Sequence, residues 1–140
     1  MPETTRPRPG TMRLANALEY RLPLGGFVSF LHRVSGALMC LLLPLVVWLF
    51  DASVTSEISY ERFRSAFDAG IGVVPAVLVK LVVLALIWSY LHHFAAGVRH
   101  LWMDVTHHVT KEAGHSSALI TLAVSLPLTA ALGAKLFGAF

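Results

Sequence analysis

Three long apolar runs take up most of the 140 residues and limit what this chain can fold into. Hydrophobic residues make up 56% of the sequence, and the mean hydropathy is +0.68. A soluble domain of this size has too little interior to hide so much apolar surface. As helices rising 1.5 Å per residue, the runs are long enough to cross the ~30 Å hydrocarbon core of a bilayer. The sequence therefore predicts an all-α membrane protein.

We expect a single transmembrane domain over residues 1–140, with three spans at about 29–51, 72–103 and 118–139. Residues 1–11 contain three prolines and are typical of a polar tail. Residues 12–28 mix apolar side chains with Arg13, Glu19 and Arg21. This mixture predicts a short amphipathic N-terminal segment that lies in the membrane interface before the first span.

The placement of charge predicts the orientation of the spans. Five arginines lie within residues 1–33, whereas the loop at residues 51–69 carries four acidic residues against two arginines. Lys and Arg outside the membrane favour the cytoplasmic side. We therefore expect a cytoplasmic N-terminus and an external C-terminus. The localisation expected for a chain of this kind is the bacterial inner membrane, where the external side is the periplasm. The basic residues form no stripe with interleaved aromatic residues, so no nucleic-acid partner is expected.

Histidines near the end of the second apolar run are candidate functional residues. His93, Gly97 and His100 are spaced by four and then three residues, so they share one face of a helix. An imidazole in hydrocarbon is costly unless it is paired, hydrogen-bonded or bound to a metal. Gly97, one turn from His93, leaves room for a flat and bulky group beside that imidazole. A plain hydrogen bond to a neighbouring helix is the simpler alternative for His93.

With the expected path, the start of the first span and the end of the second meet at the cytoplasmic face. His93 precedes Arg99 by six residues, which places it about 9 Å deeper in the membrane. A b-type haem needs this layout, because its iron is ligated inside the membrane while its acidic propionates reach cations at the surface. The polar and basic residues expected at that surface are Ser29, His32, Arg33, Arg99 and His100.

We do not expect one chain of this kind to supply both axial ligands of a haem. His32 should lie about 9 Å nearer the surface than His93, whereas two opposing ligands must lie at one depth. His92 should point about 100° away from His93 around the helix, so both cannot face one iron. The second ligand is therefore expected from another polypeptide.

Three motifs, in this order, resemble the cytochrome b membrane-anchor subunits of succinate dehydrogenase, respiratory complex II. They are YRLPL from Tyr20, S-x-x-H-R-x-S-G from Ser29, and H-x-x-x-G-x-R-H-x-x-x-D from His93. The resemblance extends from Tyr20 through the third span. It implies that His93 is an axial ligand of haem b. The doubled His92-His93 departs from the pattern and leaves the choice between these neighbours open.

The resemblance also implies a substrate and partners. Ser29 and Arg33 would help to bind ubiquinone, and His32 and Arg33 would lie near the haem propionates, where we also expect His100. A second small membrane-anchor subunit would supply the other haem ligand. Flavoprotein and iron–sulfur subunits would bind on the cytoplasmic side.

The expected function is that of the membrane-anchor cytochrome b subunit of a succinate:ubiquinone oxidoreductase. Such a subunit transfers electrons and carries out no succinate chemistry itself. An anchor of a quinol:fumarate reductase is the nearest alternative, because the direction depends on the quinone and on the soluble subunits. A haem-free structural anchor is a further alternative. A histidine-lined transport protein would need polar residues along a whole span, and the first and third apolar runs are almost bare.

We predict that a tag on the N-terminus lies in the cytoplasm and a tag on the C-terminus lies outside, because three spans separate the two ends. Protease added to intact spheroplasts should cleave the C-terminal tag and the loop at residues 51–69. Cleavage of the N-terminal tag under these conditions would contradict the expected orientation.

Overall fold

The structure is a computed structural model that describes residues 22–139, which form four helices joined by short connections. In chain order they are α2 (Leu24–Val54), α3 (Glu57–Asp68), α4 (Ala76–Thr106) and α5 (Lys111–Leu136). The polar tail and most of the amphipathic segment predicted before the first span fall outside the described residues.

Three of the helices are long and apolar enough to cross a membrane, namely α2, α4 and α5, with 31, 31 and 26 residues. This confirms the predicted all-α membrane protein with three spans. A helix of 31 residues is about 46 Å long. It therefore exceeds the ~30 Å hydrocarbon core and reaches the head-group region on at least one side.

The ends of the helices differ from the predicted spans at several points. Residues 24–28, predicted to lie in the interface, continue the helix of the first span. The third long helix begins at Lys111 instead of residue 118 because the Thr110 side chain caps it, accepting a hydrogen bond from the Ala113 N–H at 3.2 Å. The second begins at Ala76 instead of residue 72, because a turn with positive φ at Gly70 and Gly72 precedes it.

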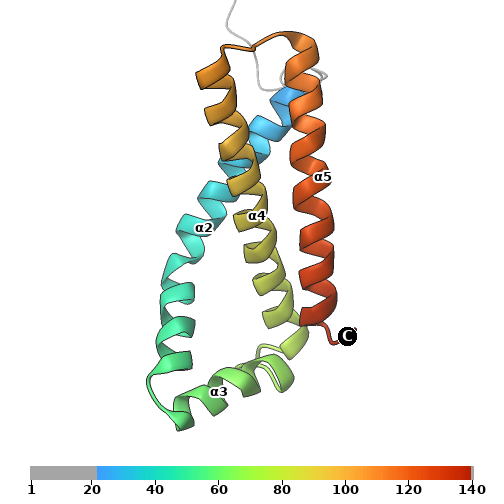
Figure 1. The fold of residues 1–140 in the computed structure, drawn as a ribbon. Coiled ribbons are helices and arrows are strands. Elements are labelled where there is room, and N and C mark those ends of the chain that lie inside the picture. The colour runs from blue at the N-terminus through green and yellow to red at the C-terminus, as the bar shows by residue number, and fades with distance from the viewer. Residues whose placement is uncertain (1–21, 140) are drawn as a thin grey trace, which may run out of the picture.

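The segment at residues 51–69, predicted only as a loop, contains helix α3. A capping box starts this helix: the Ser56 hydroxyl accepts from the Ser59 N–H at 3.2 Å, and the Ser59 hydroxyl accepts from the Ser56 N–H at 3.0 Å. Figure 1 shows α3 lying across the lower end of the molecule, against both α2 and α4.

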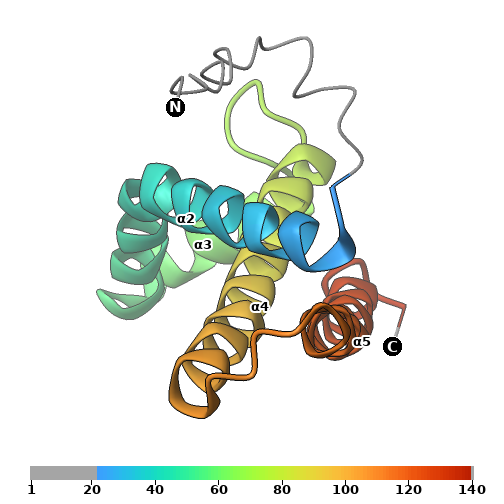
Figure 2. The same ribbon diagram turned by 90° about the horizontal axis from the view of Figure 1, so that it is seen from above.

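The long helices meet at the other end of the molecule, the upper end in Figure 1, where α2 and α5 begin and α4 finishes. Helices α4 and α5 lie side by side in opposite directions, whereas α2 crosses α4 obliquely (Figures 1 and 2). This crossing brings the first half of α2 against the second half of α4.

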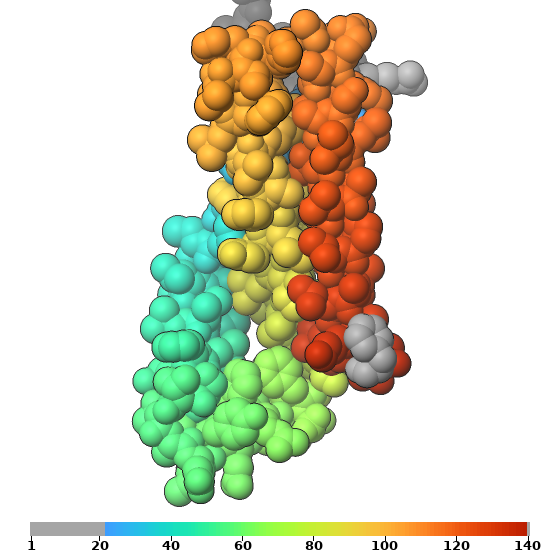
Figure 3. Space-filling model, viewed as in Figure 1, coloured from blue at the N-terminus to red at the C-terminus, as the bar shows by residue number. Residues whose placement is uncertain are grey.

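Small side chains form the contact between the three helices. Val28, Ala96 and Ala118, one from each long helix, are fully buried together, and Leu24 and Leu122 pack against them. Large apolar side chains such as Leu41, Phe50 and Phe94 instead lie on the outside of the molecule. Figure 3 shows one face of this outer surface. This arrangement suits a lipid environment, where small residues let helices approach closely and large apolar ones contact acyl chains.

Candidate functional site

The crossing of α2 and α4 brings three of the predicted site histidines together. The rings of His32 on α2 and His93 on α4 are stacked, with centroids 4.0 Å apart and planes at 17°. The ring of His100, two turns after His93, lies 5.2 Å from that of His32 at 53°. His93, His32 and His100 thus form a column of imidazoles along the contact between the two helices.

The predicted difference in depth between His32 and His93 is wrong, because their rings are in contact. The prediction counted helical rise along parallel axes, whereas α2 crosses α4 obliquely (Figure 2). His32 is nevertheless not placed as a ligand opposite His93. Two histidines that ligate one metal must point their ring nitrogens at it through bonds of ~2 Å, so their ring centroids lie well over ~4 Å apart. These two rings instead face each other with centroids 4.0 Å apart, which leaves no room for a metal porphyrin between them.

One ring nitrogen of His93 is held by the backbone of α2. His93 Nδ1 lies 3.0 Å from the carbonyl oxygen of His32 and 3.3 Å from Ser35 Oγ. A carbonyl oxygen only accepts hydrogen bonds, so we assign the ring proton to Nδ1, which donates it to His32 O. The lone pair is then on Nε2. Metal-ligating histidines commonly have this arrangement, with the other ring N–H given to a carbonyl or carboxylate.

Gly36 on α2 leaves the space that the imidazole ring of His93 occupies. A Cβ on Gly36 would lie 2.9 Å from Cε1 of His93 and 3.3 Å from its Nδ1, so only glycine fits there without displacing the ring. Gly97 was suggested by the sequence as the source of space beside His93, but a Cβ added there would meet His32 Nε2, at 3.6 Å. Gly36 closes the motif S-x-x-H-R-x-S-G, but its contact with the His93 ring was not predicted from the sequence.

His92 lies in a different environment from His93. Its side chain is fully buried, stacks on Trp88 with centroids 5.5 Å apart, and places Nδ1 3.5 Å from Ser125 Oγ on α5. Its Nε2 has no hydrogen-bond partner among residues 22–139. His92 therefore faces the closed interior of the bundle, where the packing leaves no space for a flat cofactor.

Arg99, expected at the membrane surface, is buried between the three long helices and is only 7% exposed. Its Nε donates to Ser117 Oγ on α5 at 3.0 Å, and its Nη1 donates to Ser29 Oγ on α2 at 3.2 Å. Its Nη2 donates to the carbonyl oxygen of Gly114 at 3.4 Å. These partners within the described part of the chain are all neutral.

Ser29 lies between Arg99 and the imidazole column. Its Oγ accepts the hydrogen bond from Arg99 and lies 3.5 Å from Nε2 of His100. Arg33, one turn further along α2, is exposed. The guanidinium that contacts Ser29 is therefore that of Arg99, which the sequence analysis had placed in the same cluster without a specific role.

A cavity of about 600 Å³ opens beside Ser29 and Arg99, between the start of α2 and the start of α5. Lys111 and His115 add two basic side chains to its wall. The rest of the lining consists of small or apolar residues: Pro23, Leu24, Gly25, Gly26 and Gly114.

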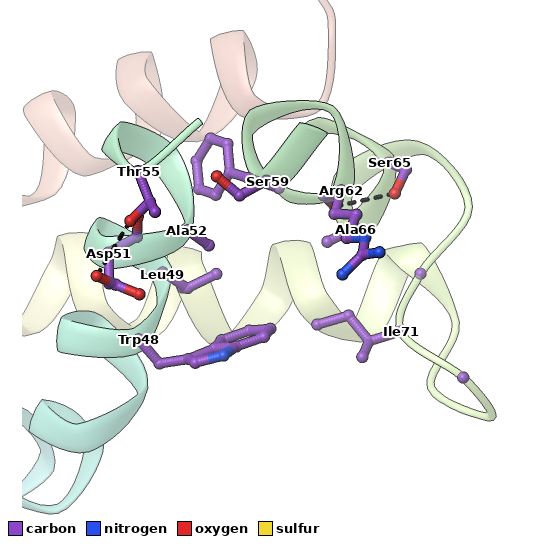
Figure 4. Close-up of a pocket in the computed structure, with 13 residues that line it drawn as sticks. Trp48, Leu49, Asp51, Ala52, Thr55, Ser59, Arg62, Ser65, Ala66 and Ile71 are labelled. Carbon is purple, nitrogen blue, oxygen red and sulfur yellow. Dashed lines mark hydrogen bonds between the residues drawn. The ribbon is translucent and has the colours of Figure 1, made fainter. Parts of the chain in front are cut away.

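Another cavity, of about 460 Å³, lies at the opposite end of the molecule, beside α3 (Figure 4). Trp48 and Asp51 of α2, Arg62 of α3 and Ile71 of the following turn contribute to its lining. None of the site residues predicted from the sequence lines it.

The fold and the polar cluster together define a small membrane protein with three candidate spans and a cluster of histidines where two of them cross. Residues 6–132 match the family of succinate dehydrogenase/fumarate reductase transmembrane subunits, so the chain belongs to that family. This confirms the resemblance found in its motifs.

Curated relatives support the same assignment. The chain is 30% identical over 109 residues to the succinate dehydrogenase cytochrome b556 subunit of Paracoccus denitrificans, covering 78% of each chain. It is 29% identical over 108 residues to the protein of the same description from Coxiella burnetii, covering 76% of this chain and 81% of the relative. For the corresponding protein of Rickettsia felis the identity is 21% over 110 residues.

Proposed function

We propose that this chain is the membrane-anchor cytochrome b subunit of a succinate:ubiquinone oxidoreductase. In this role it binds haem b together with a second membrane subunit and contributes to the quinone-reduction site. The observation that carries the proposal is the environment of His93, whose Nδ1 is held by the carbonyl of His32 while Nε2 is left to bind a metal. The relatives named as cytochrome b556 subunits support haem as the group bound.

The residues around His93 fit a haem. His93 would ligate the iron through Nε2, with its ring orientation fixed by His32 O and Ser35. His32, Arg33 and His100 would interact with the propionates, whose negative charge suits cationic and hydrogen-bonding partners. When bound, the haem supplies a one-electron redox centre within the membrane.

A second membrane subunit would provide the other axial ligand. Among the histidines near His93, His32 is stacked on its ring and His92 faces the closed interior, so neither opposes it across a porphyrin. We infer that the flavoprotein and iron–sulfur subunits bind at the end where Ser29 and Arg33 lie, which would be cytoplasmic.

Ser29 and Arg33 would bind the quinone. The cavity beside Ser29 gives a quinone head group access to the hydroxyl, which would donate to a carbonyl oxygen. That oxygen gains negative charge on reduction, and a hydroxyl donor with a nearby guanidinium stabilises it. Arg33 is exposed one turn further along α2 and does not line this cavity, and it would supply the charged contact.

The family also contains fumarate reductase subunits, so an anchor of a quinol:fumarate reductase is the second candidate. The reaction direction depends on the quinone and on the soluble subunits. The names of the three relatives favour succinate oxidation.

We predict that His93→Ala abolishes or greatly weakens haem binding while part of the complex still assembles, because the porphyrin loses one ligand but keeps its partner ligand and apolar surroundings. His92→Ala is the matched control and should leave the haem spectrum nearly unchanged. The reduced-minus-oxidised absorbance of the purified complex measures both. If the spectrum is lost in His92→Ala but kept in His93→Ala, the ligand is His92 and the prediction is contradicted.

We also predict that Gly36→Ala lowers haem occupancy, because the new methyl group would displace the His93 ring. Overpacking of this kind costs about 1–3 kcal/mol, which corresponds to roughly a five- to hundredfold weaker haem affinity. Gly114→Ala is the control, since a Cβ there meets nothing within 4 Å. Haem per complex after purification gives the comparison, and equal occupancy in both variants would contradict the expected close contact.

Ser29→Ala and Arg33→Leu should slow quinone reduction selectively. Loss of one charge-assisted donor costs about 1.5–3 kcal/mol, or roughly ten- to hundredfold in kcat/KM for quinone. Electron transfer from succinate to an artificial acceptor that bypasses the membrane should be spared, and Arg33→Leu should also perturb the haem. Normal quinone kinetics in both variants would place the quinone site elsewhere.

A further inference from the structure

We propose that Arg99 is a positioning residue of the quinone site, which fixes the Ser29 hydroxyl as a hydrogen-bond donor. This inference rests on the proposed function, because it specifies how Ser29 meets the quinone. It adds to that function a second guanidinium, buried on α4, besides the exposed Arg33 on α2.

Ser29 differs from several other helical serines in the described residues. Serine in a helix commonly turns its hydroxyl back to a carbonyl three or four residues earlier. Ser35, Ser53 and Ser65 do so, at 2.9, 2.7 and 2.9 Å. The partners of the Ser29 hydroxyl within residues 22–139 are instead the side chains of Arg99 and His100 on another helix.

The contact with Arg99 determines whether the Ser29 hydroxyl acts as a hydrogen-bond donor or acceptor toward each neighbour. A guanidinium can only donate, so Ser29 Oγ must accept from Arg99 Nη1, at 3.2 Å. The Ser29 proton is then free to point at an acceptor. His100 Nε2 at 3.5 Å is a distant acceptor, which a quinone carbonyl oxygen in the adjoining cavity would replace at a shorter distance. Donation from the guanidinium polarises the hydroxyl and strengthens its own donation to the quinone.

Arg99 is itself held in place for this contact. Its Nε and Nη2 are anchored on Ser117 Oγ and Gly114 O of α5, and burial restricts its side chain. On the α2 side, a Cβ on Gly25 would lie 3.2 Å from Arg99 Nη2. The planar fork of arginine satisfies these partners simultaneously, which the single ammonium of lysine cannot do in the same geometry.

A double-mutant cycle separates positioning from a general effect of charge. We would measure kcat/KM of the purified complex for a short-chain ubiquinone analogue in Ser29→Ala, Arg99→Gln and the double variant. Lys111→Gln is the matched comparison, because Lys111 lines the same cavity but makes no hydrogen bond to Ser29 among the described residues. Haem content and electron transfer from succinate to an artificial acceptor report on assembly.

If Arg99 acts through Ser29, each single variant should lose roughly tenfold or more in kcat/KM for quinone. The double variant should then be no worse than the more impaired single variant, within about twofold. If Lys111→Gln lowers kcat/KM, combining it with Ser29→Ala should instead give a fold loss equal to the product of the two single losses. Losses of Arg99→Gln and Ser29→Ala that multiply in the same way would overturn the proposal, as would normal quinone kinetics in Arg99→Gln.

Arg99→Lys replaces Arg99→Gln in the same cycle if the glutamine variant does not assemble, since it keeps the buried charge. The same two outcomes decide the proposal: non-multiplying losses with Ser29→Ala support it, and multiplying losses or normal kinetics contradict it. Normal kinetics in Ser29→Ala itself would refute the proposed quinone role of Ser29. Impaired kinetics in Ser29→Ala with normal kinetics in the Arg99 variants would refute the positioning role alone.

Discussion

A guanidinium buried among membrane helices must be given hydrogen-bond partners, and in this protein that requirement joins the three long helices. Arg99 of α4 reaches Ser29 of α2 and both Ser117 and Gly114 of α5. An unsatisfied charge would be far more costly in a bilayer than in a soluble interior, where water is close. The starts of α2 and α5 are therefore held against α4 near Arg99, in the region where α2 crosses α4. That crossing brings His32 against His93 and Gly36 against the His93 ring.

Apolar packing alone does little to determine which helices contact each other. The buried contacts come from Val28, Ala96 and Ala118, while most large apolar side chains face outward. In lipid these outward side chains gain nothing from being hidden, so close approach and polar contacts decide which helices meet. The polar contacts gather at one end of the bundle, and that end is where the proposed haem and quinone residues lie.

The sequence predicted the spans well because apolar length alone identifies a membrane helix. It also selected His93, since an intramembrane imidazole with a glycine one turn away is unusual. It did not predict that His32 stacks on His93, because crossing angles arise from contacts between helices and are not visible in helical rise along one of them. Helix α3 was missed although Ser56 and Ser59 have the spacing of a capping pair, since the neighbouring charges suggested a loop.

Helix α3 gives α2 a second point of support. Only Thr55 and Ser56 separate α2 from α3, and α3 rests against both α2 and α4 at the end far from Arg99. Helix α2 is thus held near both of its ends, by Arg99 at one and by α3 at the other, and His32 and Gly36 lie between these two contacts. Its tilt across α4 sets where His93 meets the α2 backbone. The length of the connection before α3 is therefore a determinant of imidazole geometry many turns away, and adding residues there would let α2 pivot about Ser29.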